Sequence, residues 1–125
     1  MTDQQKIVCI VDDDADVRKA IERILNIHGY SSRSFASVSE FQALAKPKEA
    51  VCLILDIHLK EESGIDLKRQ LSHTFPALPV IFITGRDNDA NRHAVQQVGC
   101  AAYLPKPFES KALLQALETA TRTRS

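Results

Sequence analysis

Short apolar runs alternate along the chain with longer stretches in which apolar residues recur every three or four positions. Three runs are nearly continuous, rich in β-branched residues and followed by a polar residue, which is typical of strands buried on both faces of a parallel sheet. Two weaker runs, Tyr30–Phe35 and Ala101–Leu104, are expected at the sheet edges, because polar residues interrupt the first and Pro105 closes the second. The strong runs are Ile7–Val11, Val51–Leu55 and Val80–Ile83.

Helical spacing fills each interval between these runs. Asp14 is a candidate N-cap for the first helix and Gly29 its stop, while Ser37–Glu40 is a capping box that opens a short helix ending before Pro47. The third helix is expected to begin near Gly64, the fourth to stop at Gly99 and the fifth to begin near Ser110. The apolar stripes of the first, third, fourth and fifth helices are, in that order, Val17, Ile21, Ile24, Leu25 and His28; Leu67 and Leu71; Ala90, Ala94 and Val98; and Leu113, Leu117 and Ala120.

Five strands alternating with five helices predict an α/β fold with a doubly wound parallel sheet, a single (βα)5 unit. The length of 125 residues fits one domain, expected to span residues 1–125 with a core of about 5–122. Only Thr121–Ser125 has the composition of a solvated tail or of the start of a linker.

Composition narrows the class of protein further. The 16 basic residues balance the 16 acidic ones, which argues against direct nucleic-acid binding. We find no apolar run long enough to span a membrane and no signal peptide, so a cytoplasmic location is expected. Three widely spaced cysteines, Cys9, Cys52 and Cys100, form neither a disulfide framework nor a zinc motif and are expected to be buried thiols.

The residues that follow four of the five predicted strands include carboxylates, a hydroxyl and an ammonium group. Because parallel strands joined by right-handed crossovers end at one edge of the sheet, these residues are expected to meet there. They are Asp12, Asp13 and Asp14 after the first strand, Asp56 after the third, Thr84 and Gly85 after the fourth, and Lys106 and Pro107 after the fifth.

Such a pocket suits magnesium and phosphate. Carboxylates this close repel one another unless a cation neutralises them, and an incomplete set of hard oxygen ligands favours Mg²⁺. Thr84 and Lys106 would supply a hydroxyl and a positive charge to a phosphoryl group, and Asp56 could itself be the nucleophile. Asp14 is expected only to cap its helix.

Four short motifs carry a family resemblance that covers roughly residues 5 to 122. They are Val11–Asp14, Leu55–Leu59 with Gly64 eight residues after Asp56, Ile83–Gly85, and Tyr103–Phe108. Together, in this order, they resemble the receiver domains of two-component response regulators, and most closely receivers of the FixJ type. The resemblance implies a flavodoxin-like receiver fold with strand order 2-1-3-4-5.

The resemblance also implies a role for each matching position. Asp56 would be the phosphoacceptor, and Mg²⁺ would be held by Asp12, Asp13, Asp56 and the backbone carbonyl of His58. The phosphate-binding and switch residues would be Thr84, Gly85, Lys106 and Tyr103, the Lys106–Pro107 bond would be cis, and His58 and Arg86 would tune the lifetime of the phosphoryl group.

The function implied is a phosphorylation-dependent switch. A sensor histidine kinase would donate the phosphoryl group, and the chain would catalyse only its own phosphorylation and dephosphorylation, so it is not expected to be an enzyme acting on a separate substrate. The readout face would be the fourth helix, fifth strand and fifth helix, about residues 88 to 121, which could form a homodimer. Any role in transcription would require an output domain absent from this sequence, and neither nucleic acid nor membrane is an expected partner.

One departure from the family pattern keeps alternatives open. Leu59-Lys60 stands where members usually have Met-Pro, which is expected to loosen the loop after Asp56 and add a positive charge near the site. An atypical receiver that acts as a phosphorylation-independent interaction module is therefore the main alternative. A small phosphatase or phosphotransferase and a flavin carrier are weaker ones, since the chain has no room for a cap domain and three aspartates would repel a flavin phosphate.

Overall fold

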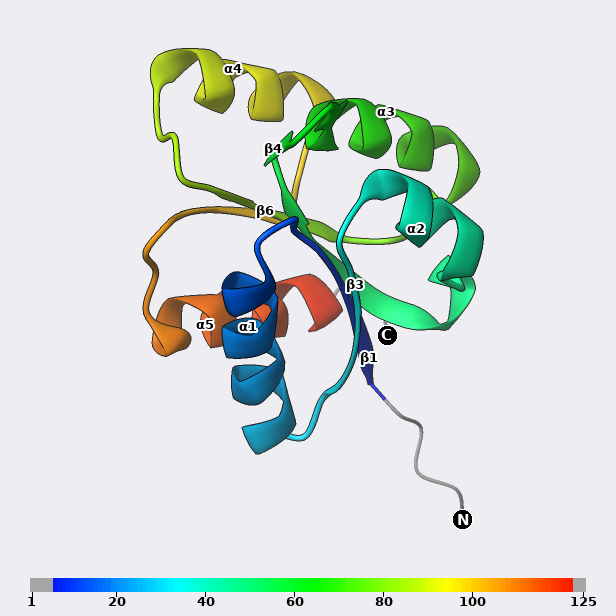
Figure 1. Ribbon diagram of the computed structural model, residues 1–125, viewed down its shortest axis with the longest axis vertical. Helices are drawn as coiled ribbons and strands as arrows, with labels where there is room; N and C mark the ends of the chain where they lie inside the picture. The colour runs from blue at the N-terminus through cyan, green and yellow to red at the C-terminus, as the bar shows by residue number, and fades with distance from the viewer. Residues whose placement is uncertain (1–5, 123–125) are drawn as a thin grey trace.

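The computed structural model describes residues 6–122 and has a five-stranded parallel sheet at its centre (Figure 1). The strand order is β2-β1-β3-β6-β7, which is 2-1-3-4-5 when only the five core strands are counted, so the predicted topology is confirmed. Both weak runs form the predicted edge strands. The strands are β1 (Ile7–Val11), β2 (Ser31–Phe35), β3 (Ala50–Asp56), β6 (Val80–Thr84) and β7 (Ala102–Pro105).

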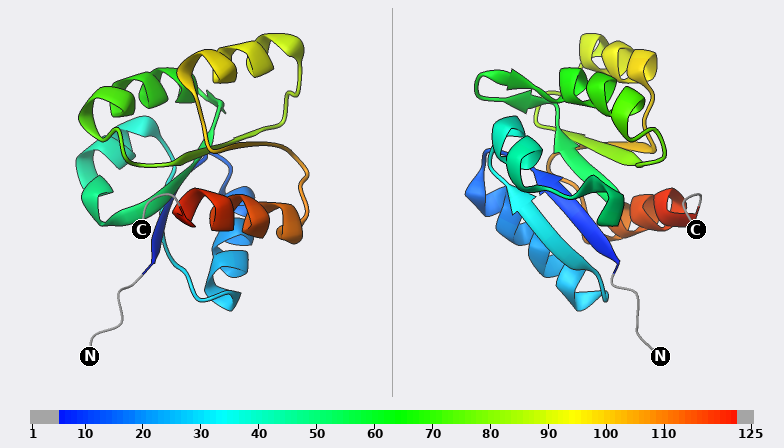
Figure 2. Two further views of the ribbon diagram at one scale, coloured as in Figure 1. Left: turned by 180° about the vertical axis from the view of Figure 1, so that it is seen from behind. Right: turned by 90° about the vertical axis from the view of Figure 1, so that its right-hand side faces the viewer.

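Five helices cover the two faces of the sheet, α1 and α5 on one and α2, α3 and α4 on the other (Figure 1 and Figure 2). The predicted caps are present: the Asp14 side chain accepts the backbone N–H of Asp16, and Ser37 Oγ accepts that of Glu40. Glu40 Oε1 accepts the N–H of Ala36, the residue before the N-cap, so only the Ser37 half of the expected capping box is present in its standard form. The helices are α1 (Ala15–Ile27), α2 (Val38–Leu44), α3 (Gly64–Thr74), α4 (Asp89–Val98) and α5 (Ser110–Arg122).

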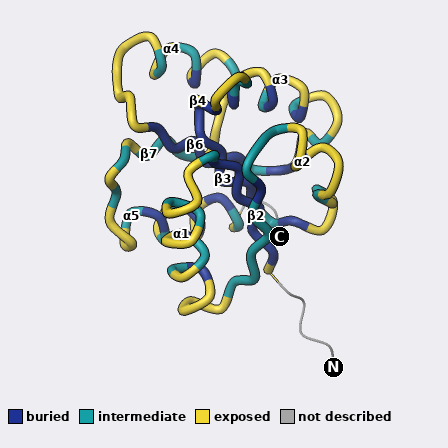
Figure 3. Tube along the Cα trace, in the orientation of Figure 1, coloured by how far each residue is buried: buried dark blue, intermediate teal, exposed yellow. Residues whose placement is uncertain are grey.

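The central strands are the most deeply buried part of the chain (Figure 3), and alternation along them divides the core between the two faces of the sheet. In β6, for example, Phe82 packs beneath α2–α4 while Ile81 and Ile83 pack beneath α1 and α5, and all three are fully buried. Successive residues of a strand point to opposite faces, so near-continuous apolar runs result when both faces are covered. This arrangement fixes the strand ends, and therefore the residues that follow them.

Several features differ from the sequence prediction. Cys9 and Cys52 are buried but Cys100 is exposed, because Gly99 ends α4 with φ +80° and Cys100 lies in the turn before β7. Thr121 and Arg122 still belong to α5 and are not a tail, and residues 123–125 lie outside the described part of the chain. A short helix η1 (Pro47–Glu49) and a hairpin of β4 (His58–Leu59) and β5 (Glu62–Ser63) were not predicted.

The hairpin gives the segment after Asp56 a regular backbone, and the loosening expected from Lys60 in place of proline stays a prediction. Two antiparallel pairs join it, His58 with Ser63 and Leu59 with Glu62, and Leu59 is buried. Within residues 6–122, none of the helices has the length and apolar character needed to cross a membrane.

Candidate functional site

Three carboxylates meet at the carboxyl edge of the sheet, between β1 and β3. This is the topological switch point, from which the chain continues outward to β2 on one side and to β6 and β7 on the other. Val11 is paired with Leu55, so Asp12 and Asp13 at the end of β1 come to lie beside Asp56 at the end of β3. Each aspartate offers an oxygen within 4.8 Å of those of the other two. Asp12 and Asp56 are buried, at 0% and 5% exposure, whereas Asp13 is half-buried. Open α/β sheets place their ligand sites at this point of the topology.

Lys106 joins two of these carboxylates from the far end of the chain. Its Nζ donates to Asp12 Oδ2 at 2.8 Å and to Asp56 Oδ2 at 3.1 Å, and its side chain is only 22% exposed. The backbone N–H of Lys106 donates to the carbonyl of Thr84, and the Lys106–Pro107 peptide bond is cis, as the resemblance implies. The lysine therefore sits at the centre of the acidic cluster.

Backbone N–H groups fix the carboxylates from other sides. Asp12 Oδ1 accepts the N–H of Asp14 at 2.8 Å, and Asp56 Oδ1 accepts the N–H of His58 at 3.2 Å. Asp13 Oδ2 accepts the N–H of Lys60 at 3.2 Å. The acids are consequently held in place by bonds to two segments of the chain, the start of α1 and the β4–β5 hairpin.

Burial and charge shift the protonation of this cluster. Burial raises the pKa of Asp56, the nearby charge of Asp12 raises it further, and Lys106 opposes both. Burial alone would lower the pKa of Lys106, but the hydrogen bond to Asp12 and the charge of Asp56 outweigh it, so the lysine is held protonated. One ammonium is thus paired with two of the three acids, which leaves an excess of negative charge in a poorly solvated place.

The donor set fits Mg²⁺. All three side chains offer hard oxygen atoms, no sulfur or imidazole is among the three, and the protein cage is incomplete, as is usual for magnesium sites that also bind phosphate. Among the described residues, these three aspartates are the one set of three or more possible ligands that lie close enough together to hold a metal ion. A divalent cation would neutralise the charge that Lys106 leaves uncompensated.

Gly64 allows the backbone to close over Asp56. A Cβ at this position would overlap the carbonyl oxygen of Asp56, and the Gly64 N–H donates to the carbonyl of Ile57 at 2.9 Å. Any larger side chain would push the start of α3 away from the end of β3. The glycine of the sequence motif therefore has a steric reason at the site itself.

The residues after β6 line the same edge but are bonded among themselves. Thr84 is fully buried, and its hydroxyl accepts the N–H of Arg86 at 2.9 Å and lies 3.3 Å from the carbonyl oxygen of Arg86. Gly85 and Arg86 are exposed. The switch and lifetime roles of these three positions remain predictions.

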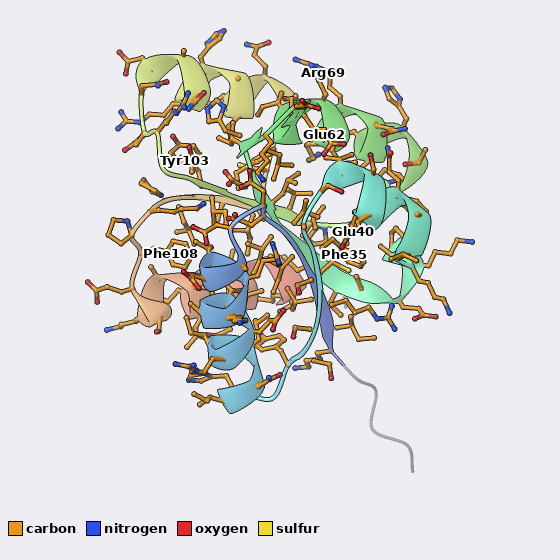
Figure 4. All side chains as sticks on the ribbon, in the orientation of Figure 1. Phe35, Glu40, Glu62, Arg69, Tyr103 and Phe108 are labelled. Carbon is orange, nitrogen blue, oxygen red and sulfur yellow. The ribbon has the colours of Figure 1, made fainter. Side chains whose placement is uncertain are left out.

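Tyr103 is half-buried and belongs to a cluster that the sequence did not reveal. Figure 4 labels Tyr103 at this edge of the sheet. Its hydroxyl donates to Asp87 Oδ1 at 3.1 Å, and Arg92 donates to both oxygens of Asp87 at 2.7 and 2.9 Å. The His58 side chain is exposed, and its Nε2 lies 3.1 Å from Asn91 Nδ2. These contacts join the loop after β6 to α4 and β7, and no regular spacing in the sequence signals them.

A (βα)5 sheet that gathers three aspartates, a threonine and a lysine at its switch point has the architecture of a phosphoacceptor receiver. The comparison with known families agrees: residues 8–118 match the response regulator receiver domain, and the chain belongs to this family.

Individual relatives are consistent with this assignment. The response regulator protein TmoT of Ectopseudomonas mendocina is 32% identical over 98% of the chain. A response regulator receiver domain protein from Methanospirillum hungatei superposes with a TM-score of 0.87 at 26% identity, over 95% of this chain and 96% of that one. A response regulator from Burkholderia pseudomallei, whose structure contains a phosphorylated aspartic acid and a calcium ion, gives 0.81 at 26% identity over 94% and 69%. The chain spans about half the length of the curated relatives, 56% of TmoT.

Proposed function

We propose that this receiver is a switch that accepts a phosphoryl group on Asp56 from the phosphohistidine of a sensor kinase, with Mg²⁺ held by Asp12, Asp13 and Asp56. The observation that carries the proposal is the acidic cluster itself, with three carboxylates within 4.8 Å and Lys106 bonded to Asp12 and Asp56. The Burkholderia pseudomallei relative with its phosphorylated aspartic acid supports the same chemistry.

The transfer follows from the groups at the site. A carboxylate oxygen of Asp56 attacks the phosphorus, an O–P bond forms, and the P–N bond to the kinase histidine breaks, with the electron pair leaving on the imidazole. Lys106 is already 3.1 Å from Asp56 and is placed to stabilise charge on the incoming phosphoryl group. The metal, when bound, supplies charge neutralisation to the same oxygens. No general base is required, because the nucleophile is a carboxylate.

The readout would begin at Thr84. Its hydroxyl is bonded to Arg86, and exchanging these bonds for one to the phosphoryl group would shift the loop after β6. Tyr103 responds to the same loop through Asp87, and the affected face is formed by α4, β7 and α5. We place a phosphorylation-dependent homodimer, or contact with an output domain, on that face, and His58 and Arg86 would set the lifetime of the modified state.

An apolar groove beside the site supports a kinase as phosphoryl donor. Val17, Ala20 and Ile24 of α1 form one wall, and Pro107 and Phe108 form the other, with Lys106 at the end next to the acids. A helix that carries a phosphohistidine could bury an apolar stripe here while its imidazole faces Asp56.

The test is incubation of the chain with Mg²⁺ and acetyl phosphate, followed by intact-mass measurement. We expect a mass increase of one phosphoryl group that is lost in Asp56→Asn and retained in the matched control Asp66→Asn, an exposed aspartate of α3. An increase that survives Asp56→Asn would refute the acceptor assignment. An unmodified wild-type chain would favour the alternative, a phosphorylation-independent interaction module.

We also propose that the chain turns over no separate substrate. Asp56 is enclosed by Asp12, Lys106 and the start of α3, and its own phosphorylation and dephosphorylation are the reactions this enclosure favours. Steady release of phosphate from an added phosphomonoester, abolished by Asp56→Asn, would contradict this proposal.

A further inference from the structure

The hairpin β4–β5 lies between the acidic cluster and the start of α2, and it is bonded to both. Its turn carries Lys60, which stands where family members usually have proline, and its second strand carries Glu62. Buried Leu59 fixes the hairpin against the core below α3 and α2. The segment therefore has three points of attachment rather than the freedom of an open loop.

The first attachment depends on the absence of proline. The N–H of Lys60 donates to Asp13 Oδ2 at 3.2 Å, and proline has no N–H to donate. Lys106 forms ion pairs with Asp12 and Asp56, and within residues 6–122 it forms none with Asp13. The hairpin thus supplies a hydrogen-bond donor to Asp13, just as Lys106 supplies one to Asp12 and Asp56.

The second attachment is an inter-element helix cap. Glu62 lies beside the start of α2 (labelled in Figure 4). Its Oε1 accepts the N–H of Val38 at 2.9 Å, and its Oε2 accepts the hydroxyl of Ser39 at 3.0 Å. Both donors belong to the first turn of α2, where unsatisfied N–H groups and the helix dipole favour a carboxylate. Charge-assisted bonds of this kind are among the stronger hydrogen bonds, so α2 anchors the hairpin firmly.

We propose that Glu62 and the Lys60 N–H are positioning groups for the metal site: α2 holds the hairpin through Glu62, and the hairpin holds the Asp13 carboxylate toward Asp12 and Asp56. This inference rests on the proposed function, since it concerns the affinity of the three acids for Mg²⁺. The positive side chain of Lys60 opposes a cation nearby, so its contribution comes from the backbone and not from its charge.

The experiment measures Mg²⁺ affinity of the full 125-residue chain by calorimetry, with ¹H–¹⁵N spectra to follow individual amides. Glu62→Ala is expected to weaken binding about tenfold, the lower end of the range for partners that orient metal ligands. Glu61→Ala removes the same charge from the exposed tip of the same hairpin and is expected to weaken it less than about twofold, by screened electrostatics alone. Glu62→Gln, which keeps an acceptor for Val38, should recover part of the loss.

Two Lys60 variants separate backbone from charge. Lys60→Pro removes the N–H and should weaken Mg²⁺ binding as Glu62→Ala does, whereas Lys60→Ala keeps the N–H, loses the positive charge and should bind at least as tightly as wild type. If the proline variant fails to fold, the amide signal of Lys60 is compared between wild type and Asp13→Ala, which removes the acceptor; an unchanged signal would show that the bond is absent and overturn the inference.

The outcomes distinguish this inference from the proposed function. Wild type that binds Mg²⁺, with Glu62→Ala and Lys60→Pro binding equally well, would overturn the positioning role and leave the metal site intact. Lower stability of these variants without a change in affinity would assign the hairpin a structural role only, and would also overturn the inference. Absence of Mg²⁺ binding by wild type would refute the metal site and this inference with it.

Discussion

The acidic cluster around Asp56 and the ion-pair cluster around Asp87 both place carboxylates against a cation at the same edge of the sheet, yet only the first is withdrawn from water. Asp12 and Asp56 are buried, and Lys106 is largely covered. Asp87 and Arg92 are bonded at shorter or similar distances but lie in solvent. Geometry alone does not distinguish the two, so burial must decide what each can do.

The pKa of an aspartate is consequently shifted in opposite directions in the two clusters. Burial raises the pKa of Asp56, whereas the hydrogen bond from Arg92 lowers the pKa of Asp87. A buried carboxylate lacks water to stabilise its charge and gains from a metal or a phosphoryl group, while an exposed one is already satisfied. The first cluster is therefore suited to chemistry, and the second to holding Tyr103 in one orientation.

The largest effect is expected on removing the buried cation. Lys106→Met keeps the apolar stem but leaves Asp12 and Asp56 facing each other, and should lower the free energy of unfolding by about 2–3 kcal/mol, less than for a fully buried pair because the lysine is 22% exposed. Urea unfolding at pH 7 without Mg²⁺ measures it.

The matched change in the exposed cluster is Arg92→Ala, for which we expect a much smaller loss because water replaces the lost partner. Added Mg²⁺ should restore part of the stability of Lys106→Met and have no comparable effect on Arg92→Ala. Equal losses in the two variants would show that burial does not separate the clusters.

The two clusters also differ in how far their contacts could be predicted from the sequence. Asp12, Asp56 and Lys106 follow apolar runs, and a parallel sheet must bring the ends of its strands together, so their meeting could be predicted without any knowledge of loops. The two layers of the core follow from the same strand pattern. The acids come together because the strands are regular and parallel, and such strands are predictable from their apolar pattern.

The remaining contacts depend on irregular backbone. Asp87 and Arg92 lie five positions apart across a loop and a helix start, and Glu62 reaches Val38 across 24 positions through a hairpin that has only two residues in each strand. Neither spacing has a period to detect. The exposed Cys100 also lies in irregular backbone, in the turn between α4 and β7 next to Gly99 with its positive φ.

A smaller effect, of opposite sign, is expected from neutralising the buried acid. Burial and the nearby Asp12 raise the pKa of Asp56, which means that folding disfavours its charged form. Asp56→Asn removes this charge and should therefore stabilise the chain by about 1 kcal/mol at pH 7 in the absence of Mg²⁺. Urea unfolding of the variant and wild type gives the difference. Asp87→Asn is the matched control and should not stabilise, because the pKa of Asp87 is lowered and its charged form is favoured by folding.

The dependence on pH follows from the direction of the shift. With a raised pKa in the folded state, the folded chain binds more protons than the unfolded one, so wild type loses stability as pH rises through the folded-state pKa of Asp56. The advantage of Asp56→Asn should therefore be largest at neutral pH and shrink as pH falls toward the ordinary aspartate value of about 4. An advantage that grows on acidification would contradict burial as the cause.

The smallest effect on stability, but a specific spectroscopic one, is expected in the exposed cluster. Burial and then the hydrogen bond to Asp87 raise the pKa of Tyr103, so Asp87→Asn should lower that pKa toward its ordinary value while scarcely changing the free energy of unfolding. Titration of the Tyr103 ring signals by NMR measures it. Asp89→Asn is the control, since Asp89 also faces Arg92, at 3.9 Å, but the bond to the tyrosine comes from Asp87. A pKa that stays raised in Asp87→Asn would mean that burial alone sets it, and the exposed cluster would then have no hold on the ring through which we propose the phosphorylated state is read.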